Sequence, residues 1–437
     1  MATFLDYARD EVRTFAEQPF CGEDALIFSQ LVYLSFPDAL ATKSLTLQQL
    51  LRRETYPALI DEMSHGQEAL ELLRLCGESP RFRDVRLADR ISPNSTADPN
   101  RFCAATFILP DSTRVIAFRG TDGTIAGWHE DYRLLFVTPP LDSQARALAY
   151  LKSHASAHLA ERPEIIITGH SMGGNLAIYA AAVAPHSVQS RIRAVYAQDS
   201  PGFIRSFIES QQFQAIRSRV HKYVPESSMV GMLFDSGVEE TVVRSNAHGS
   251  EQHFLSTWLF THPQIEQEAS GEEQKPALKS TSEKSHEQAP ETSQKPASEQ
   301  AQEQAYKPAH KPAHEPALKP SNEPASVTAS APQPSDLWVL DRTEHLSRYS
   351  QALANTLNGW RESLDVAQRE RFIETLFSAL DSTGYVQFSQ LRENWNTVIP
   401  VISQYLRSLP ATDRNQLSSA IGELVKLIVL PSGEENS

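Results

Sequence analysis

Short β-rich runs alternate with longer helical stretches between residues 102 and 245 of the chain. The β-rich runs contain many Val, Ile, Phe, Tyr and Thr residues, and they lie at 102–109, 113–120, 164–169, 193–198, 219–224 and 240–245. Helical stretches at 144–160 and 175–185 lie between several of these runs. An alternation of this kind predicts an α/β domain in which helices cover the faces of a sheet.

Apolar residues at helical spacing also occur outside this region. Residues 22–36 place Ala25, Phe28, Leu31 and Val32 on one side of a helix, so we expect an additional helix packed on the core. The C-terminal region has a similar pattern and predicts a small all-helical unit with an apolar packing face. Its apolar positions are Leu346, Tyr349, Leu353, Leu357 and Trp360, then Phe372, Leu376 and Leu380, and finally Leu417, Ile421, Leu424 and Ile428.

Residues 263–335 differ in composition from the rest of the chain. Irregular repeats of Lys-Pro-Ala and Glu-Pro-Ala stand in a background rich in Ser, Glu and Gln. Proline every few residues interrupts helices and strands, and the segment offers almost no apolar side chains to bury. We therefore expect a disordered linker between an α/β domain at 1–262 and a helical segment at 336–437.

Composition and charge argue against several classes of function. The 437 residues include 54 acidic and 40 basic side chains, for a formal net charge of -14, so nucleic-acid binding is not expected. The three scattered cysteines indicate neither a disulfide framework nor a zinc site. No apolar run reaches the roughly 20 residues that span a bilayer, and the amino terminus lacks the apolar region of a secretory signal. We expect a soluble, cytoplasmic protein with no integral membrane association.

The stretch Gly169-His170-Ser171-Met172-Gly173 lies between a predicted strand and a predicted helix. Gly-x-Ser-x-Gly in this context is the pattern of a nucleophile elbow, a tight strand-to-helix turn that raises the serine hydroxyl above the edge of a sheet. Small neighbours are required because the turn brings the strand and the helix close together. The pattern therefore predicts that Ser171 is a nucleophile.

Residues 113–120 end in a second glycine turn, which is followed by Thr121. An acyl-transfer enzyme needs hydrogen-bond donors at the position where the oxyanion forms. The backbone amide of Met172, directly after the nucleophile, is one predicted donor. Thr121 is the other, through its backbone amide and its hydroxyl.

The sequence around these turns resembles the class 3, fungal-type lipases of the α/β-hydrolase superfamily, and most closely their bacterial lipase-like relatives. The resemblance is carried by AFRGTDGTIAGWHED, TGHSMGGNLAIYAA, DSPGF, VPESSMVGML and EQHFLSTW, with support from PFCGEDALIFSQLVYLSF. It covers residues 1–262 and resumes after residue 337, so the linker is interpreted as an insertion. It implies an α/β-hydrolase fold with a mostly parallel central sheet, and cleavage of carboxylic esters by a Ser-His-Asp triad. It also implies a small ester or lipid-like substrate and no cofactor.

His253 is the predicted general base. A serine hydroxyl becomes an effective nucleophile when a histidine takes its proton, and a carboxylate must orient that histidine. The order along α/β-hydrolase chains is Ser, acid, His, so the base must follow Ser171, and His221 lies too early because it is inside a predicted strand. His253 lies in the loop after the run 240–245, and His248 in the same loop is the reserve.

The triad acid is less clear from the sequence. Fungal-type lipases carry it in a stretch like Asp-x-Val-Pro, but at the matching place this chain has Ser228. Asp199 follows the preceding β-rich run and would emerge at the sheet edge near Ser171, so we favour Asp199. Asp235 and Glu226 are the alternatives, and a turn-capping role for Asp199 is a competing interpretation.

These observations predict a lipase- or esterase-like serine hydrolase that forms an acyl-enzyme intermediate. The same triad could cleave thioesters or amides, and the sequence does not distinguish these substrates. The departure from Asp-x-Val-Pro also leaves open a catalytically silent scaffold that recruits protein partners of unknown identity. A fold alone does not decide among these functions.

Overall fold

The computed structural model describes residues 1–34, 44–51, 66–91, 102–135, 137, 139–155, 162–262 and 337–415. Residues Met1–His262 and Trp338–Ser437 belong to one compact unit. The linker expected at 263–335 and the apolar stripe expected at 417–428 lie outside the described residues. Both therefore stay predictions, as do the domain boundaries.

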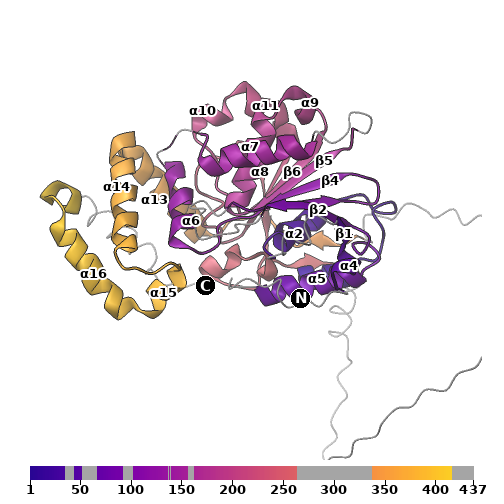
Figure 1. The fold of residues 1–437 in the computed structure, drawn as a ribbon, viewed down its shortest axis with the longest axis horizontal. Coiled ribbons are helices and arrows are strands. Elements are labelled where there is room, and N and C mark those ends of the chain that lie inside the picture. The colour runs from indigo at the N-terminus through magenta and orange to yellow at the C-terminus, as the bar shows by residue number, and fades with distance from the viewer. Residues whose placement is uncertain are drawn as a thin grey trace, which may run out of the picture. The chain divides into compact units, whose positions relative to one another are not determined.

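A nine-stranded mixed sheet forms the centre of this unit (Figure 1). In spatial order its strands are β1 (Leu45–Thr46), β2 (Arg86–Ile91), β3 (Ala104–Ile108), β4 (Arg114–Phe118), β5 (Ile165–His170), β6 (Ile192–Gln198), β7 (Val220–Pro225), β8 (Glu240–Val243) and β11 (Arg342–Thr343). The β-rich runs of the sequence correspond to β3–β8. The α/β class is therefore confirmed, and β1, β2 and β11 extend the sheet at its two edges.

The expectation of a mostly parallel sheet is wrong. Strands β4–β8 pair in parallel, whereas β1–β4 and the β8–β11 pair are antiparallel. With the separate β9–β10 pair, five ladders between described strands are antiparallel and four are parallel. The physical reason is the length of the connections. Residues 109–113 are too few for a crossover helix, so β3 and β4 form an antiparallel hairpin.

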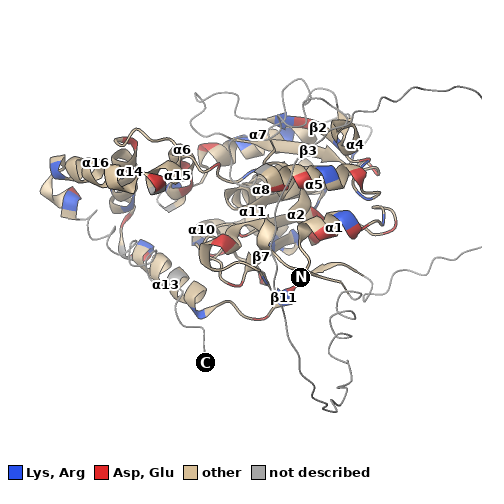
Figure 2. Ribbon diagram, turned by 90° about the horizontal axis from the view of Figure 1, so that it is seen from below, with Lys and Arg blue, Asp and Glu red and all other residues tan. Residues whose placement is uncertain are grey.

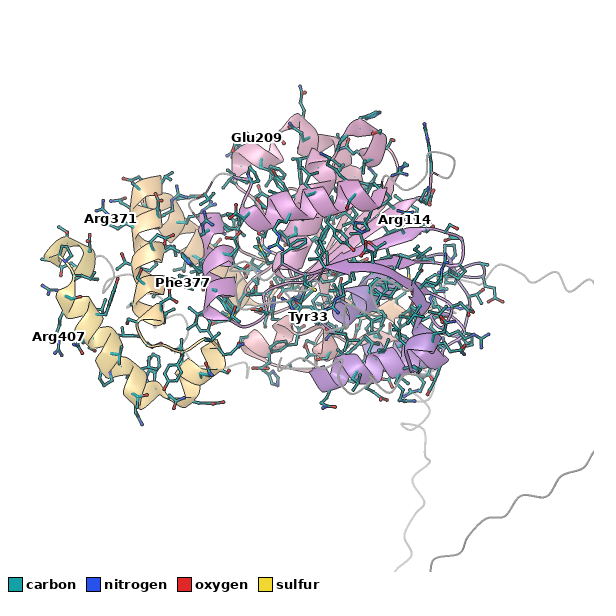
Figure 3. The ribbon with its side chains drawn as sticks, in the orientation of Figure 1. Tyr33, Arg114, Glu209, Arg371, Phe377 and Arg407 are labelled. Atoms are coloured by element: carbon teal, nitrogen blue, oxygen red, sulfur yellow. The ribbon has the colours of Figure 1, made fainter. Side chains whose placement is uncertain are left out.

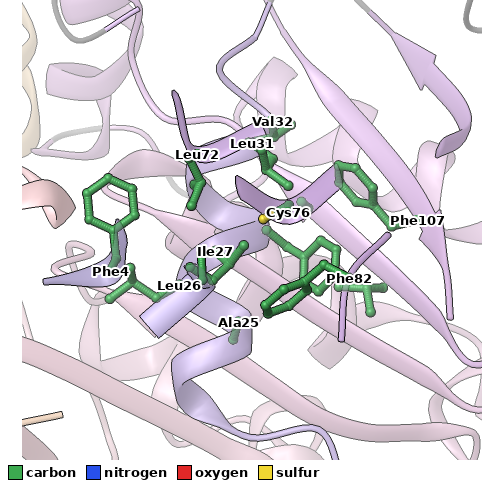
Figure 4. Packing of buried hydrophobic residues seen from close by; sticks show 14 of the residues in the cluster. Phe4, Ala25, Leu26, Ile27, Leu31, Val32, Leu72, Cys76, Phe82 and Phe107 are labelled. Carbon is green, nitrogen blue, oxygen red and sulfur yellow. The ribbon is translucent and has the colours of Figure 1, made fainter. Parts of the chain in front are cut away.

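Helices cover both faces of the sheet (Figure 1). The first face carries α1 (Phe4–Asp10), α2 (Gly22–Leu31), α4 (Leu47–Leu51) and α5 (Gly66–Glu78), and the second carries α7 (Asp142–Ala155), α8 (Met172–Val183) and α11 (Gln211–Ile216). Strand β4 shows why two layers form, because Val115 and Ala117 join the first apolar cluster whereas Ile116 and Phe118 join the second. The additional helix expected near the amino terminus is α2, whose Leu26 and Ile27 are fully buried (Figure 4).

Shorter elements connect these layers. They are α6 (Ile125–Tyr132), α9 (His186–Gln189), α10 (Arg205–Ile208), and the 3-10 turns Arg133–Leu135, Arg217–Arg219, Gly249–His253 and Leu255–Thr257. Among the described residues, no helix is long and apolar enough to cross a membrane. Lys or Arg and Asp or Glu occur together on the same helices, as α1 and α5 show in Figure 2.

Residues 337–415, here called the C-terminal segment, join the sheet before they become helical. Strand β10 (Val339–Leu340) pairs with β9 (Phe260–Thr261), and β11 pairs with β8. The helices that follow are α13 (Arg348–Ser363), α14 (Val366–Asp381), α15 (Phe388–Glu393) and α16 (Trp395–Ser408). Phe372 and Phe377 of α14 are buried in an apolar cluster with Ile125 of α6. The apolar pattern expected at 372–380 is thus a packing face.

Candidate active site

Ser171 stands at a sharp turn between β5 and α8. Its φ and ψ angles are 57° and -133°, which places this non-glycine residue in the left-handed half of conformational space. A Cβ atom on Gly169 would come within 2.3 Å of the Gly173 backbone, and one on Gly173 within 2.1 Å of the Phe118 carbonyl oxygen. The spacing of small residues that predicted an elbow therefore has a steric cause, and Ser171 stands at the apex of the turn.

Asp199 and His253 are brought together at the same edge of the sheet. The Nδ1 of His253 donates a hydrogen bond of 2.6 Å to Oδ2 of Asp199. Asp199 follows β6 and is fully buried, whereas the His253 side chain is 22 % exposed. The His253 ring also lies beside the ring of His170, the residue before Ser171, with 4.5 Å between centroids. A buried carboxylate thus orients an accessible imidazole next to the elbow.

The second oxygen of the Asp199 carboxylate is held by the loop after β7. The hydroxyl of Ser228 and the amide of Gly231 both donate to Oδ1, the latter at 3.0 Å. Burial alone raises the pKa of Asp199, but the hydrogen bond and charge of His253 and the hydrogen bond of Ser228 outweigh it, so the pKa lies below its ordinary value. Asp199 is therefore an ionised partner for His253 at neutral pH.

The alternative residues occupy different surroundings. Asp235 is exposed, and its carboxylate accepts a hydrogen bond of 2.9 Å from the amide of Gly237 in its own turn. Glu226 lies at the start of the loop after β7, where its backbone pairs with Val243. His248 is exposed at the beginning of the 3-10 turn that ends at His253. The structure thus pairs Asp199 with His253 and leaves Asp235 and His248 at the surface.

The two predicted oxyanion residues line one small, partly open cavity, in which a water-sized molecule has about 30 Å³ available. Met172 is the first residue of α8, where backbone amides have no acceptor within the helix. The Thr121 hydroxyl donates a hydrogen bond to Asp131, so this hydroxyl is already engaged and the Thr121 amide is the better candidate donor. Burial raises the pKa of Asp131 to about 7, although the Thr121 hydrogen bond opposes the rise. Ser171 does not line this cavity.

Tyr33, which no sequence motif marks, links the three turns of the site together with His170. Its hydroxyl accepts a hydrogen bond of 3.2 Å from the Gly120 amide and lies 3.0 Å from Nδ1 of His170. Nε2 of His170 lies 2.7 Å from the carbonyl oxygen of His253. Because a carbonyl can only accept, Nε2 carries the proton in the neutral ring and Nδ1 accepts from Tyr33.

This series of hydrogen bonds joins the turn before Thr121, the elbow and the loop that carries His253. Burial raises the pKa of Tyr33, so the phenol stays protonated and able to donate (Tyr33 is labelled in Figure 3). A lone tyrosine far from the motifs gives no sequence signal, whereas His170 was visible inside the elbow motif. No group of three or more His, Cys, Asp or Glu side chains in the described ranges could hold a metal ion.

A family model described as Mbeg1-like matches residues 76–301, which is just over half of the 437 residues. Solved structures with similarity include the M37 lipase, at 15% identity and a TM-score of 0.32 over 49% of this chain and 70% of that one. A triacylglycerol lipase from Penicillium expansum is 13% identical, with a TM-score of 0.28 over 40% of this chain and 72% of that one. The search of curated proteins finds no match.

Proposed function

Because the chain belongs to the Mbeg1-like family, a lipase-like family, we propose that it is a serine hydrolase that cleaves carboxylic esters. Within lipases, we place it nearest the class 3, fungal-type enzymes and their bacterial relatives, on the strength of its elbow and oxyanion-turn motifs. A small ester or a lipid-like ester is the substrate class that this reaction implies. The observation that carries the proposal is the buried Asp199 bonded to His253 beside the Ser171 elbow.

The proposed reaction uses each of these residues at one step. Ser171 Oγ attacks the ester carbonyl while His253 takes its proton, and the imidazolium then protonates the departing alcohol. Asp199 holds the imidazole with Nδ1 protonated, so Nε2 is the atom that accepts and returns the proton. The amides of Met172 and Thr121 stabilise the oxyanion. Water, activated by His253, then cleaves the acyl-enzyme and frees Ser171.

Labelling with a fluorophosphonate probe tests the proposal, because the probe forms a covalent bond only with an activated serine. We expect wild-type protein to be labelled at Ser171 and to hydrolyse short p-nitrophenyl esters, and Ser171→Ala to do neither. Ser153→Ala is the matched control, since Ser153 is exposed on α7. Folded wild-type protein without labelling or turnover would favour the silent-scaffold alternative. Turnover of thioesters or amides in place of esters would change the substrate class but keep the triad.

A further inference from the structure

The loop of residues 226–235 is bonded along its length to α13 of the C-terminal segment. At the start of the helix, the Ser347 amide donates to the Glu226 carbonyl at 2.7 Å, and the buried Ser350 hydroxyl donates to the Ser228 carbonyl. Further along the helix, Asn358 bonds to the loop through both ends of its side-chain amide. These contacts come from a part of the sequence that lies beyond residues 263–336.

The Asn358 contacts fix the far end of the loop. Its Nδ2 donates to the Met232 carbonyl at 3.3 Å, and its Oδ1 accepts from the Phe234 amide at 3.1 Å. From the core side, the buried Lys222 ammonium donates to the Gly231 carbonyl at 2.6 Å. The loop is therefore held between α13 and the sheet.

The same loop determines how Asp199 presents its carboxylate. Ser228 and Gly231 both bond to Oδ1, so Oδ2 is left facing Nδ1 of His253. Ser228 makes both contacts: its hydroxyl donates to Oδ1 of Asp199, and its backbone carbonyl accepts from the Ser350 hydroxyl. One residue thus separates α13 from the carboxylate.

The C-terminal segment also contacts the turn that carries Thr121. The Ile125 amide donates to the Val386 carbonyl at 2.8 Å, and the Phe388 amide donates to the Gly123 carbonyl at 3.1 Å. Val386 precedes α15 and Phe388 is its first residue. The segment therefore touches the site at two separate points.

We propose that α13 is a positioning element of the active site, which acts through the 226–235 loop to fix the carboxylate of Asp199. The inference rests on the hydrolase function proposed above and assigns a role to the C-terminal segment within it. The hydrogen bonds that Ser350 and Asn358 make to the loop do not reach Ser171 or His253. Its removal changes the orientation of Asp199 and hence of His253, and misplacement of a catalytic group by about 1 Å can cost roughly 10²-fold in rate.

Two variants of α13 test this role. Ser350→Ala and Asn358→Ala each remove side-chain bonds to the loop and leave the helix intact, so each is expected to lower kcat about tenfold with KM nearly unchanged. Thr356→Ala is the matched control, because it also removes a polar group from α13, and the Thr356 hydroxyl bonds within its own helix to Ala352. A rise in KM with kcat retained would contradict a positioning role.

A double-mutant cycle separates this role from general loss of stability. If Ser350 acts through Ser228, then Ser350→Ala must cost much less kcat in a Ser228→Ala background than in wild type. The inference would be overturned if the losses of kcat in Ser350→Ala and Ser228→Ala multiplied in full in the double variant. A wild-type kcat in both α13 variants would overturn it as well. Should Ser350→Ala fail to fold, the same comparison is made with Asn358→Ala.

A second readout needs no turnover, so it separates the two proposals. Hydrogen exchange at the Gly231 amide, which bonds to Asp199, is expected to be faster in Ser350→Ala and Asn358→Ala than in Thr356→Ala. Wild-type protein without any hydrolysis would refute the proposed function, while faster exchange would still support the link from α13 to Asp199. An active wild type with unchanged exchange in both variants would refute that link alone.

Discussion

Two buried carboxylates, Asp24 and Asp199, show how differently one functional group is used in this molecule. Asp24 lies in α2, and both of its oxygens accept from the guanidinium of Arg81, at 2.7 and 2.6 Å. Neither side chain of this pair has any exposed surface. Asp199 is equally buried, but its partner His253 is 22 % exposed. The two sites therefore differ in the partner rather than in the acid.

The partner decides what each carboxylate can do. A guanidinium keeps its charge at every accessible pH, so Arg81 cannot take a proton from Asp24 or give one to it. The pair has a structural role, because it fixes Arg81 to helix α2. An imidazole can accept and return a proton near neutral pH, and the exposure of His253 leaves its ring accessible from outside the core. The comparison predicts that changes at Asp199 affect turnover, whereas changes at Asp24 affect stability.

The largest effect is expected from Asp199→Asn. The amide keeps the shape of the side chain but favours the wrong imidazole tautomer and removes the charge that stabilises the imidazolium, so kcat should fall by about 10⁴, the loss that the same change causes in a serine protease. Steady-state kinetics on folded protein checks this. Asp235→Asn is the matched control and should keep most of the rate. A folded Asp199→Asn variant with near-normal kcat would remove Asp199 from the triad.

Asp199→Asn should also alter stability at acid pH. The hydrogen bond and charge of His253 hold the pKa of Asp199 below its ordinary value in the folded protein, so its ionised form stabilises the fold above that ordinary value, and the contribution is lost as pH falls through the lowered pKa of the folded state. The variant lacks this contribution and should show a weaker loss of stability on acidification. Urea unfolding of both proteins at pH 5 and at lower pH measures the difference. The same dependence of unfolding free energy on pH in both proteins would contradict a lowered pKa of Asp199.

Asp24→Asn is expected to act on stability instead. It leaves the Arg81 guanidinium buried without its charged partner, which costs about 3–5 kcal/mol of unfolding free energy. The backbone carbonyls of Arg13 and Gln18 still accept from Arg81, so some of its hydrogen bonds persist. Urea unfolding measures the loss, and kcat per folded molecule should be unchanged. A large fall in kcat in a fully folded Asp24→Asn variant would contradict the prediction that Asp24 affects stability and not turnover.

Two tyrosine hydroxyls give a finer version of the comparison. Tyr33→Phe breaks the link between Gly120 and His170, so we expect kcat to fall about tenfold through small displacements of the three turns. Tyr7→Phe removes the hydroxyl that donates to Asp24 at 2.9 Å and should cost about 1 kcal/mol of stability with kcat retained. Kinetics and urea unfolding on both variants check this, and equal kcat values in the two variants would contradict it.

The smallest effect is expected from replacing residues 263–336. Strand β9 pairs with β10 in antiparallel register, with Thr261 opposite Val339, so the chain leaves and re-enters the fold at adjacent points. A short Gly-Asn-Gly-Ser turn can close this hairpin, and loop length has a weak effect on stability. Ester turnover should stay within about twofold of wild type. A collapse of turnover in the folded variant would assign a role in the chemistry to the replaced residues.

The sequence predicted the central strands well because their residues alternate between two apolar layers. The edge strands escaped prediction for a physical reason. Strands β1 and β11 are two residues long, and the apolar residues of β2 are interrupted by the exposed Arg86 and Asp89 and by the buried Arg90. Their pairing depends on neighbours far away in the chain, which no local pattern reveals. This is also why the share of antiparallel ladders was underestimated.

The site shows the same division. The elbow was readable because its glycines, its strand and its helix are consecutive in sequence. The sequence could not show that Asp199, and not Asp235, bonds to His253, because the path of the loop after β7 is what brings Ser228 to Asp199. In the sequence, Ser228 is a departure from Asp-x-Val-Pro, and in the structure its hydroxyl bonds the carboxylate that stands one strand earlier. Tyr33 was missed because its partners Gly120 and His170 lie far from it in the sequence.

Ser171 and Asp199 share one further property, since both are non-glycine residues with positive φ, at 57° and 41°. Backbone strain of this kind costs on the order of 1–3 kcal/mol at each residue and persists only where the surrounding structure enforces it. The two strained residues directly follow the adjacent strands β5 and β6, so the fold carries both costs at one edge of the sheet. Glycine adopts such angles without this cost, so a relative under selection for stability alone is expected to carry glycine at these positions. The residue types at these two positions therefore offer a way to sort members of the family into active and inactive proteins before any substrate is known.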